Sequence, residues 1–120
     1  MTMKKIGYVA VFVSDMDRAV DFYEKKLGIP VRARSDEFPV WVEMATEGVT
    51  LALNSAAPEL VKRPTGITFM VSDLQGLYDR MQGQGVRFSA PPERQPWGGV
   101  TASVLDPDGN EIGLLEQMAP

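Results

Sequence analysis

The sequence contains no cysteine and no histidine among its 120 residues. The lack of cysteine excludes disulfides, thiolate nucleophiles and cysteine-based zinc or iron–sulfur sites. The lack of histidine removes the usual general base near neutral pH and the commonest side-chain ligand of transition metals. Ser14 and Ser72 therefore have no imidazole to activate them, and no nucleophile–base pair is visible.

Basic charge and long apolar runs are also scarce. Lys and Arg number 12 against 16 Asp and Glu, giving a net charge of −4. No basic patch is visible, so we expect no nucleic-acid partner. No run approaches the roughly 20 apolar residues of a membrane span, and the short apolar run near the N-terminus alternates and breaks at Ser14-Asp15. We expect no membrane partner and a cytoplasmic location.

An internal repeat is the main positive feature. The triplet "VSD" occurs at residues 13–15 and again at 71–73. An alternating, β-branched run precedes each copy, "GYVAVFV" and "GITFMV", and each reads as a strand. Asp15 and Asp73 are good helix N-caps, apolar residues follow them at helical spacing, and glycine ends each helix.

Three further strand-like segments follow the helix in each copy, separated only by short turns. The first copy continues with "PVRARS", "PVWVEMAT" and "VTLALNS", and the second with "VRFSA", "GGVTASVLD" and "NEIGLLEQ". The pattern predicts an α+β fold of two βαβββ modules, about 5–54 and 65–117, joined by a linker at 55–64. The whole chain, 1–120, is predicted to be one domain, with the modules forming one curved eight-stranded mixed sheet whose concave side suits a small molecule.

Three stretches carry a resemblance to a known family. They are "VAVFVSDMDRAVDFYEKKLG" (Val9–Gly28), "ITFMVSDL" (Ile67–Leu74) and "DPDGNEIGLLE" (Asp106–Glu116). In these the chain resembles the vicinal oxygen chelate superfamily, which includes glyoxalase I, bleomycin-resistance and fosfomycin-resistance proteins and extradiol dioxygenases. The resemblance covers Ile6 to Gln117 and implies the fold described above. It also implies a homodimer.

The resemblance further implies where a metal would be bound. Metal-dependent members hold one divalent ion with ligands on the first and fourth strands of each module. In this chain those positions fall on Tyr8 and Gly66, on Thr50 or Ala52, and on Gly113. Phenol is a poor ligand at neutral pH, since its pKa is about 10, and glycine offers no side chain. We therefore expect no metal and no other cofactor.

Two nearby carboxylates do not change that expectation. Glu111 shares the alternation parity of Gly113 but lies towards the rim, next to the turn. Glu116 has the opposite parity and should point towards the helices or solvent. A single carboxylate would hold a divalent ion only weakly.

Alternation also predicts which residues face the concave side. Three aromatics could wall the pocket, Phe38, Trp41 and Trp97, with Arg94 as an anion or carbonyl clamp. Trp97 could equally cap the end of the barrel, and Arg94 could simply be solvated. The predicted ligand-binding residues are Tyr8, Phe12, Trp41, Thr50, Ala52, Asn54, Thr68, Met70, Arg94, Trp97, Glu111 and Gly113. No catalytic residue is assigned.

Three functions remain open at this point. The first is a metal-free protein that binds and sequesters a small organic compound or antibiotic, as in the bleomycin-resistance branch. The second is an enzyme, either a glyoxalase-like lyase or isomerase with an atypical site, or a metal-free variant using Tyr8 or Glu111 as acid or base. The third is a regulatory or partner-binding subunit whose cavity is vestigial.

Overall fold

The computed structural model describes residues 2–117, and the chain divides into two compact units, Met1–Val61 and Lys62–Pro120. Each unit contains a strand, a helix and three further strands, in that order. The predicted α+β class and βαβββ order are therefore confirmed. The strands are hydrogen-bonded as two four-stranded sheets, one in each unit.

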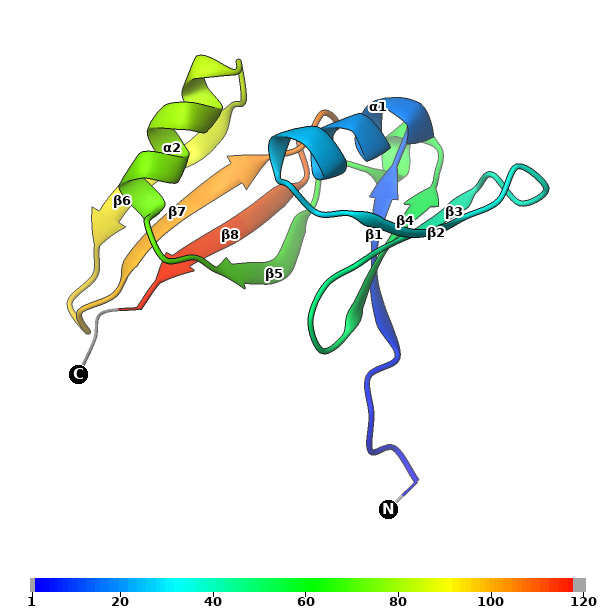
Figure 1. Ribbon diagram of the computed structural model, residues 1–120, viewed down its shortest axis with the longest axis horizontal. Coiled ribbons are helices and arrows are strands. Elements are labelled where there is room, and N and C mark those ends of the chain that lie inside the picture. The colour runs from blue at the N-terminus through cyan, green and yellow to red at the C-terminus, as the bar shows by residue number, and fades with distance from the viewer. Residues whose placement is uncertain (1, 118–120) are drawn as a thin grey trace. The chain divides into compact units, whose positions relative to one another are not determined.

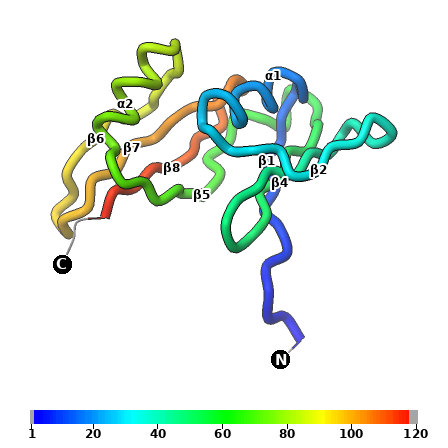
Figure 2. The backbone as a smooth tube through the Cα atoms, in the orientation of Figure 1, coloured from blue at the N-terminus to red at the C-terminus, as the bar shows by residue number. Residues whose placement is uncertain are grey.

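The first unit has the strand order β1-β4-β3-β2, with β1 parallel to β4 and the other pairs antiparallel. One helix lies across one face of this sheet, and Figure 2 follows the β2–β3 connection, drawn in cyan, as a loop at the end of the two strands. The elements are β1 (Tyr8–Val13), α1 (Met16–Asp21), a π-helical turn (Phe22–Lys26), β2 (Val31–Arg34), β3 (Trp41–Met44), β4 (Thr50–Ser55) and a 3-10 turn (Pro58–Leu60).

The second unit repeats this arrangement with the order β5-β8-β7-β6, in which β5 is parallel to β8. Its helix again lies across one face of the sheet (Figure 1). The elements are β5 (Pro64–Met70), α2 (Leu74–Gly83), β6 (Phe88–Arg94), β7 (Val100–Leu105) and β8 (Glu111–Glu116). The linker was expected at 55–64, but its first residue, Ser55, is the last of β4 and its last residue, Pro64, is the first of β5.

The two predicted N-caps are confirmed. The side chain of Asp15 accepts from the backbone N–H of Arg18 at 3.1 Å, and that of Asp73 accepts from Gly76 at 3.1 Å. Each bond satisfies one of the donors that the first turn of a helix leaves free. Glu116 points to the helix side, as its parity predicts, and accepts from the N–H of Leu74 at 2.7 Å.

Two elements differ from the sequence prediction. The first helix ends in a π-helical turn, where the N–H of Leu27 bonds to the carbonyl of Phe22 at 3.1 Å. The sixth strand, expected only over "VRFSA", begins at Phe88 and continues through two prolines to Arg94. Proline lacks the N–H that a central strand needs, but β6 is an edge strand with only β7 beside it, so the missing donor is tolerated.

Each sheet packs one face against its helix. In the first unit Val11, Val13, Val42 and Met44 are buried on that face, together with Tyr23 of the helical segment. The Tyr23 side chain is fully buried. The opposite face of each sheet is not covered by a helix of its own unit (Figure 1). By strand register it carries most of the residues predicted to bind a ligand.

The "DPDGN" turn joins β7 to β8 in the second unit. Asp106 Oδ1 accepts from the backbone N–H groups of Asp108 and Asn110 at 3.0 and 2.9 Å, and Asn110 Nδ2 donates to Asp106 Oδ2 at 2.9 Å. Gly109 supplies the positive φ, 83°, that the turn requires. Asn110 Oδ1 in turn accepts from the N–H of Arg63 at 3.0 Å, so the turn also holds the chain just before β5.

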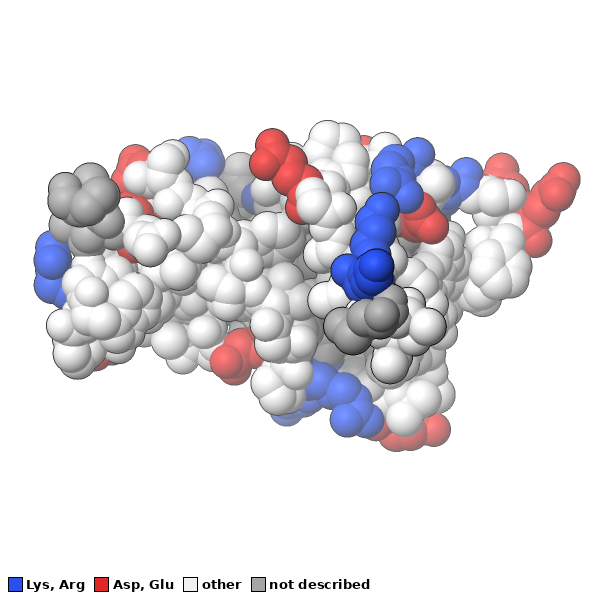
Figure 3. Space-filling view, turned by 90° about the horizontal axis from the view of Figure 1, so that it is seen from below, with Lys and Arg blue, Asp and Glu red and all other residues white. Residues whose placement is uncertain are grey.

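Within residues 2–117, no helix has the length and apolar character needed to cross a membrane. Figure 3 shows one face of the molecule, on which most of the surface is uncharged and the charged side chains lie in small groups, several of them with basic and acidic side chains next to each other.

Candidate functional site

The open face of the first sheet brings together most of the ligand-binding residues predicted for the first module. Burial on β1 alternates, with Val11 and Val13 turned to the helix while Tyr8 and Phe12 remain 54% and 40% exposed. The strand register places Tyr8 beside Thr50, and it places Trp41 beside Asn54. The residues on this face are Tyr8, Ala10, Phe12, Trp41, Glu43, Thr50, Ala52 and Asn54.

Two aromatic rings meet on this face. Tyr8 and Trp41 pack edge to face, with ring centroids 4.8 Å apart and planes at 88°. Tyr8 lies opposite Thr50 and Trp41 opposite Asn54, so Ala52 occupies the position between them on the strand that separates the two rings. Ala52 has no exposed surface. A small side chain at that position lets the rings approach each other across β4, and we name Tyr8 and Trp41 the aromatic pair.

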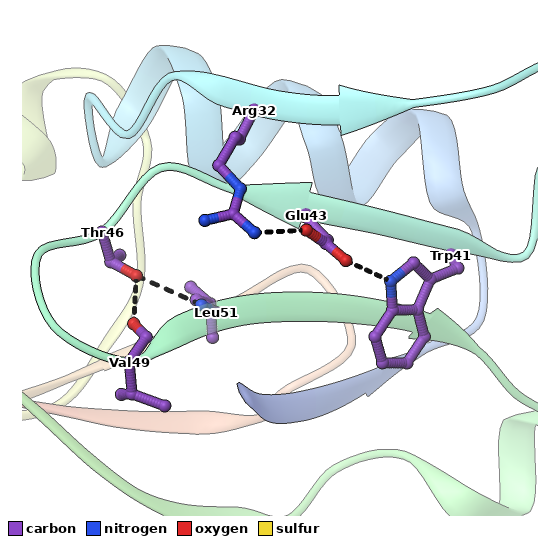
Figure 4. Close-up of polar contacts among 6 residues, drawn as sticks. All are labelled: Arg32, Trp41, Glu43, Thr46, Val49 and Leu51. Atoms are coloured by element: carbon purple, nitrogen blue, oxygen red, sulfur yellow. Dashed lines mark hydrogen bonds and ion pairs between the residues drawn. The ribbon is translucent and has the colours of Figure 1, made fainter. Parts of the chain in front are cut away.

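A carboxylate holds the tryptophan of the aromatic pair. The indole Nε1–H of Trp41 donates to Glu43 Oε2 at 3.1 Å, and Arg32 Nη2 donates to Glu43 Oε1 at 2.7 Å (Figure 4). Each carboxylate oxygen therefore has its own donor. These two hydrogen bonds, led by the one from Trp41, hold the pKa of Glu43 below its ordinary value, so this carboxylate is ionised at neutral pH.

An irregularity in β2 puts Arg32 and Arg34 on opposite faces of the sheet. Val31 pairs with Met44 and Ala33 with Glu43, and the register shifts between them. In a regular strand, residues 32 and 34 would share a face. Arg32 lies on the open face and reaches Glu43, whereas the shift places Arg34 opposite Val42 on the helix side, where it forms an ion pair with Asp17 of α1. The sequence alone did not indicate Arg32.

The turn between β3 and β4 is closed by a single threonine. Thr46 Oγ1 donates to the carbonyl of Val49 at 2.7 Å and accepts from the N–H of Leu51 at 3.1 Å (Figure 4). These bonds fix the point at which β4 begins, and hence the register that places Ala52 between the rings.

The open face of the second sheet is different in character. It carries Gly66, Thr68 and Met70 from β5, with Thr68 opposite Gly113 on β8. A Cβ added at Gly113 would lie 2.6 Å from Thr68 Oγ1 and 3.3 Å from its Cβ. The threonine side chain therefore occupies the space that any side chain at position 113 would need.

The remaining predicted residues belong to other elements than those of the aromatic pair. Arg94 ends β6 and is exposed. Trp97 is 62% exposed in the β6–β7 turn, and its ring lies over Gly99, where an added Cβ would meet it at 2.1 Å. Phe38 is 60% exposed in the β2–β3 connection. Glu111 is exposed at the start of β8. Their roles in ligand binding stay predictions.

The residues at the family's metal-ligand positions do not fit a divalent ion. Tyr8 and Thr50 offer only hydroxyl oxygens, and Gly66 and Gly113 offer no side chain. In the described part of the chain, no three Asp or Glu side chains are grouped so that they could hold a metal ion.

We expect Gly113→Ala to lower the free energy of unfolding by roughly 1–3 kcal/mol, because the added methyl group overpacks against Thr68. In a Thr68→Ala background the same substitution should cost clearly less, since the nearest atom, Oγ1, is gone. Urea denaturation of the four proteins gives the coupling directly. Equal losses in both backgrounds would show that Thr68 does not restrict this position.

The fold and the site together define a class of protein. It has two βαβββ modules, a helix on one face of each sheet, and an aromatic pair on the open face of the first sheet. The model of the Glyoxalase/Bleomycin resistance protein/Dioxygenase superfamily matches residues 5–114. The chain belongs to this superfamily.

Individual relatives agree with this assignment. YetH of Bacillus subtilis (strain 168), an uncharacterized protein, is 32% identical over 120 residues, which cover 95% of this chain and 99% of YetH. The structure of TnmS3, an antibiotic binding protein from Streptomyces sp. CB03234, is similar with a TM-score of 0.82 and 29% identity, covering 98% of this chain and 99% of TnmS3. A superfamily member from Sphaerobacter thermophilus DSM 20745 has a TM-score of 0.78 and 27% identity, covering 98% and 100%.

Proposed function

We propose that this protein binds and sequesters a small organic compound, such as an antibiotic, without a metal ion. The observation that carries the proposal is the aromatic pair on an open sheet face, with Trp41 held by Glu43. Aromatic side chains bury much apolar area and stack on flat ligands at little entropic cost. Similarity to the antibiotic binding protein TnmS3 over nearly the whole of both chains supports the same function.

The charges around the aromatic pair favour a neutral ligand. Arg32 compensates the negative charge of Glu43 directly. A cation stacked on the pair would therefore gain little from this carboxylate, in spite of the net charge of −4. A flat, uncharged ring system fits both the aromatic surface and its balanced charges. Assembly as a homodimer and a cytoplasmic location remain part of the proposal.

The test combines elemental analysis with a ligand screen. We expect purified protein to contain no stoichiometric metal, and neutral aromatic compounds and antibiotics to raise its melting temperature, because a ligand bound only by the native state stabilises it. One tightly bound ion per chain, or turnover of a substrate on addition of Ni²⁺, Zn²⁺ or Mn²⁺, would favour the enzyme instead. No stabilisation by any compound would favour a vestigial site.

A further inference from the structure

The indole of Trp41 is held at two separate points. Its ring packs against Tyr8 of β1, and its Nε1–H donates a hydrogen bond to Glu43, which lies with Trp41 on β3. A ring contact alone leaves the side chain free to rotate, since edge-to-face packing tolerates a range of angles. The hydrogen bond at Nε1 removes that freedom, because it fixes the direction in which the plane of the indole lies.

Glu43 can perform this task because it is itself fixed. A carboxylate held by only one hydrogen bond on an exposed strand could rotate away. In Glu43, Oε1 accepts from Arg32 at 2.7 Å while Oε2 accepts from the indole. Hydrogen bonds between charged groups are shorter and stronger than neutral ones. The contacts therefore run in a continuous line from Arg32 through Glu43 and Trp41 to Tyr8, across all four strands of the sheet.

We propose that Glu43 is a positioning residue that orients the Trp41 indole for stacking on a flat aromatic ligand. This inference rests on the proposed function and deepens it by naming the residue that gives the site its preference for planar rings. The physical reason is preorganisation: an indole already held in place need not be ordered by the ligand on binding. The benefit applies to a ligand that stacks, and not to one that only fills space.

Two neutral probes with the same carbon skeleton test the proposal. Naphthylmethanol is flat, and its fully hydrogenated counterpart, decahydronaphthylmethanol, is not. Binding is followed by proton–nitrogen correlation NMR, in which Trp41 and Trp97 each give one indole N–H signal and Trp97→Phe identifies which is which. We expect naphthylmethanol to shift the Trp41 signal and to bind more tightly than the saturated probe.

The decisive variant is Glu43→Gln, which keeps the size of the side chain but leaves a single oxygen acceptor for two donors. We expect the Trp41 indole signal to move upfield and exchange faster with water, and the affinity for naphthylmethanol to fall roughly two- to tenfold, the range for ordering one side chain. Affinity for the saturated probe should hardly change. Glu47→Gln is the matched control, because Glu47 is exposed in the β3–β4 turn, and it should leave both signals and affinities as they are.

The outcomes separate the two proposals. If Glu43→Gln moves the indole signal but binds naphthylmethanol as tightly as the native protein, the positioning role is wrong and the binding function stands. If the native protein shows no shift with either probe, aromatic binding at this face is wrong, and the positioning role fails with it. Should Glu43→Gln not fold, Arg32→Met tests the same step, because it removes the donor that fixes the carboxylate and should weaken naphthylmethanol binding selectively.

Discussion

Replacing Asp106 with alanine is expected to lower the free energy of unfolding by roughly 2–4 kcal/mol, because it removes the acceptor for three hydrogen bonds in a buried turn. Asp106 is only 1% exposed, so water cannot replace the lost acceptor fully. The amide of Asn110 loses its partner at Nδ2, and its other bond, to the N–H of Arg63, is weakened as the turn loosens. Urea denaturation followed by circular dichroism gives the measurement.

Two further variants make this result specific. Asp106→Asn keeps one oxygen that can accept from the backbone donors, but it places an N–H₂ group against the N–H₂ group of Asn110. We therefore expect an intermediate loss in the free energy of unfolding. Asp36→Ala changes an exposed aspartate in the β2–β3 connection, and it should alter stability by no more than about 0.5 kcal/mol. A loss for Asp106→Ala no larger than that of Asp36→Ala would contradict the role assigned to the turn.

Replacing Trp41 with alanine is expected to weaken binding of naphthylmethanol at least tenfold, and roughly thirtyfold if the residue behaves as a typical aromatic hot spot. The substitution removes the stacking surface, leaves Tyr8 without its ring partner, and takes the indole donor from Glu43. Trp41→Phe keeps a ring but loses the hydrogen bond, and its affinity for naphthylmethanol should lie between those of the native protein and Trp41→Ala. Titrations followed by proton–nitrogen correlation NMR measure all three proteins.

The second tryptophan provides the discriminating comparison. Sequence reasoning gave both Trp41 and Trp97 as candidates for the ligand site, and Trp97 lies on the β6–β7 turn of the other unit with its ring over Gly99. If Trp97→Ala abolished binding while Trp41→Ala did not, the site would lie at that turn, and the proposal for the aromatic pair would be wrong.

Much of the fold follows from short-range sequence signals. The repeated Val-Ser-Asp triplet predicted two copies of one module, and Asp15 and Asp73 cap their helices as expected. Alternation on β1 predicted which side chains turn from the core, and the exposed Tyr8 and Phe12 agree with it. The sequence was less reliable at β6, where the strand expected only over "VRFSA" continues through two prolines to Arg94 as an edge.

Composition and alternation by themselves determined the duplicated α+β class, the caps and the "DPDGN" turn, because each depends on residues a few positions apart. The resemblance to the family then placed Tyr8, Gly66 and Gly113 at its metal-ligand positions. Only the tertiary structure decided that Arg32 joins Glu43, that Ala52 lies between two rings, and that Thr68 fills the space above Gly113. These contacts depend on strand register, which pairs segments far apart in the chain. The glycine at position 113 is therefore explained by the space that Thr68 occupies on the neighbouring strand as much as by the absence of a metal ligand there.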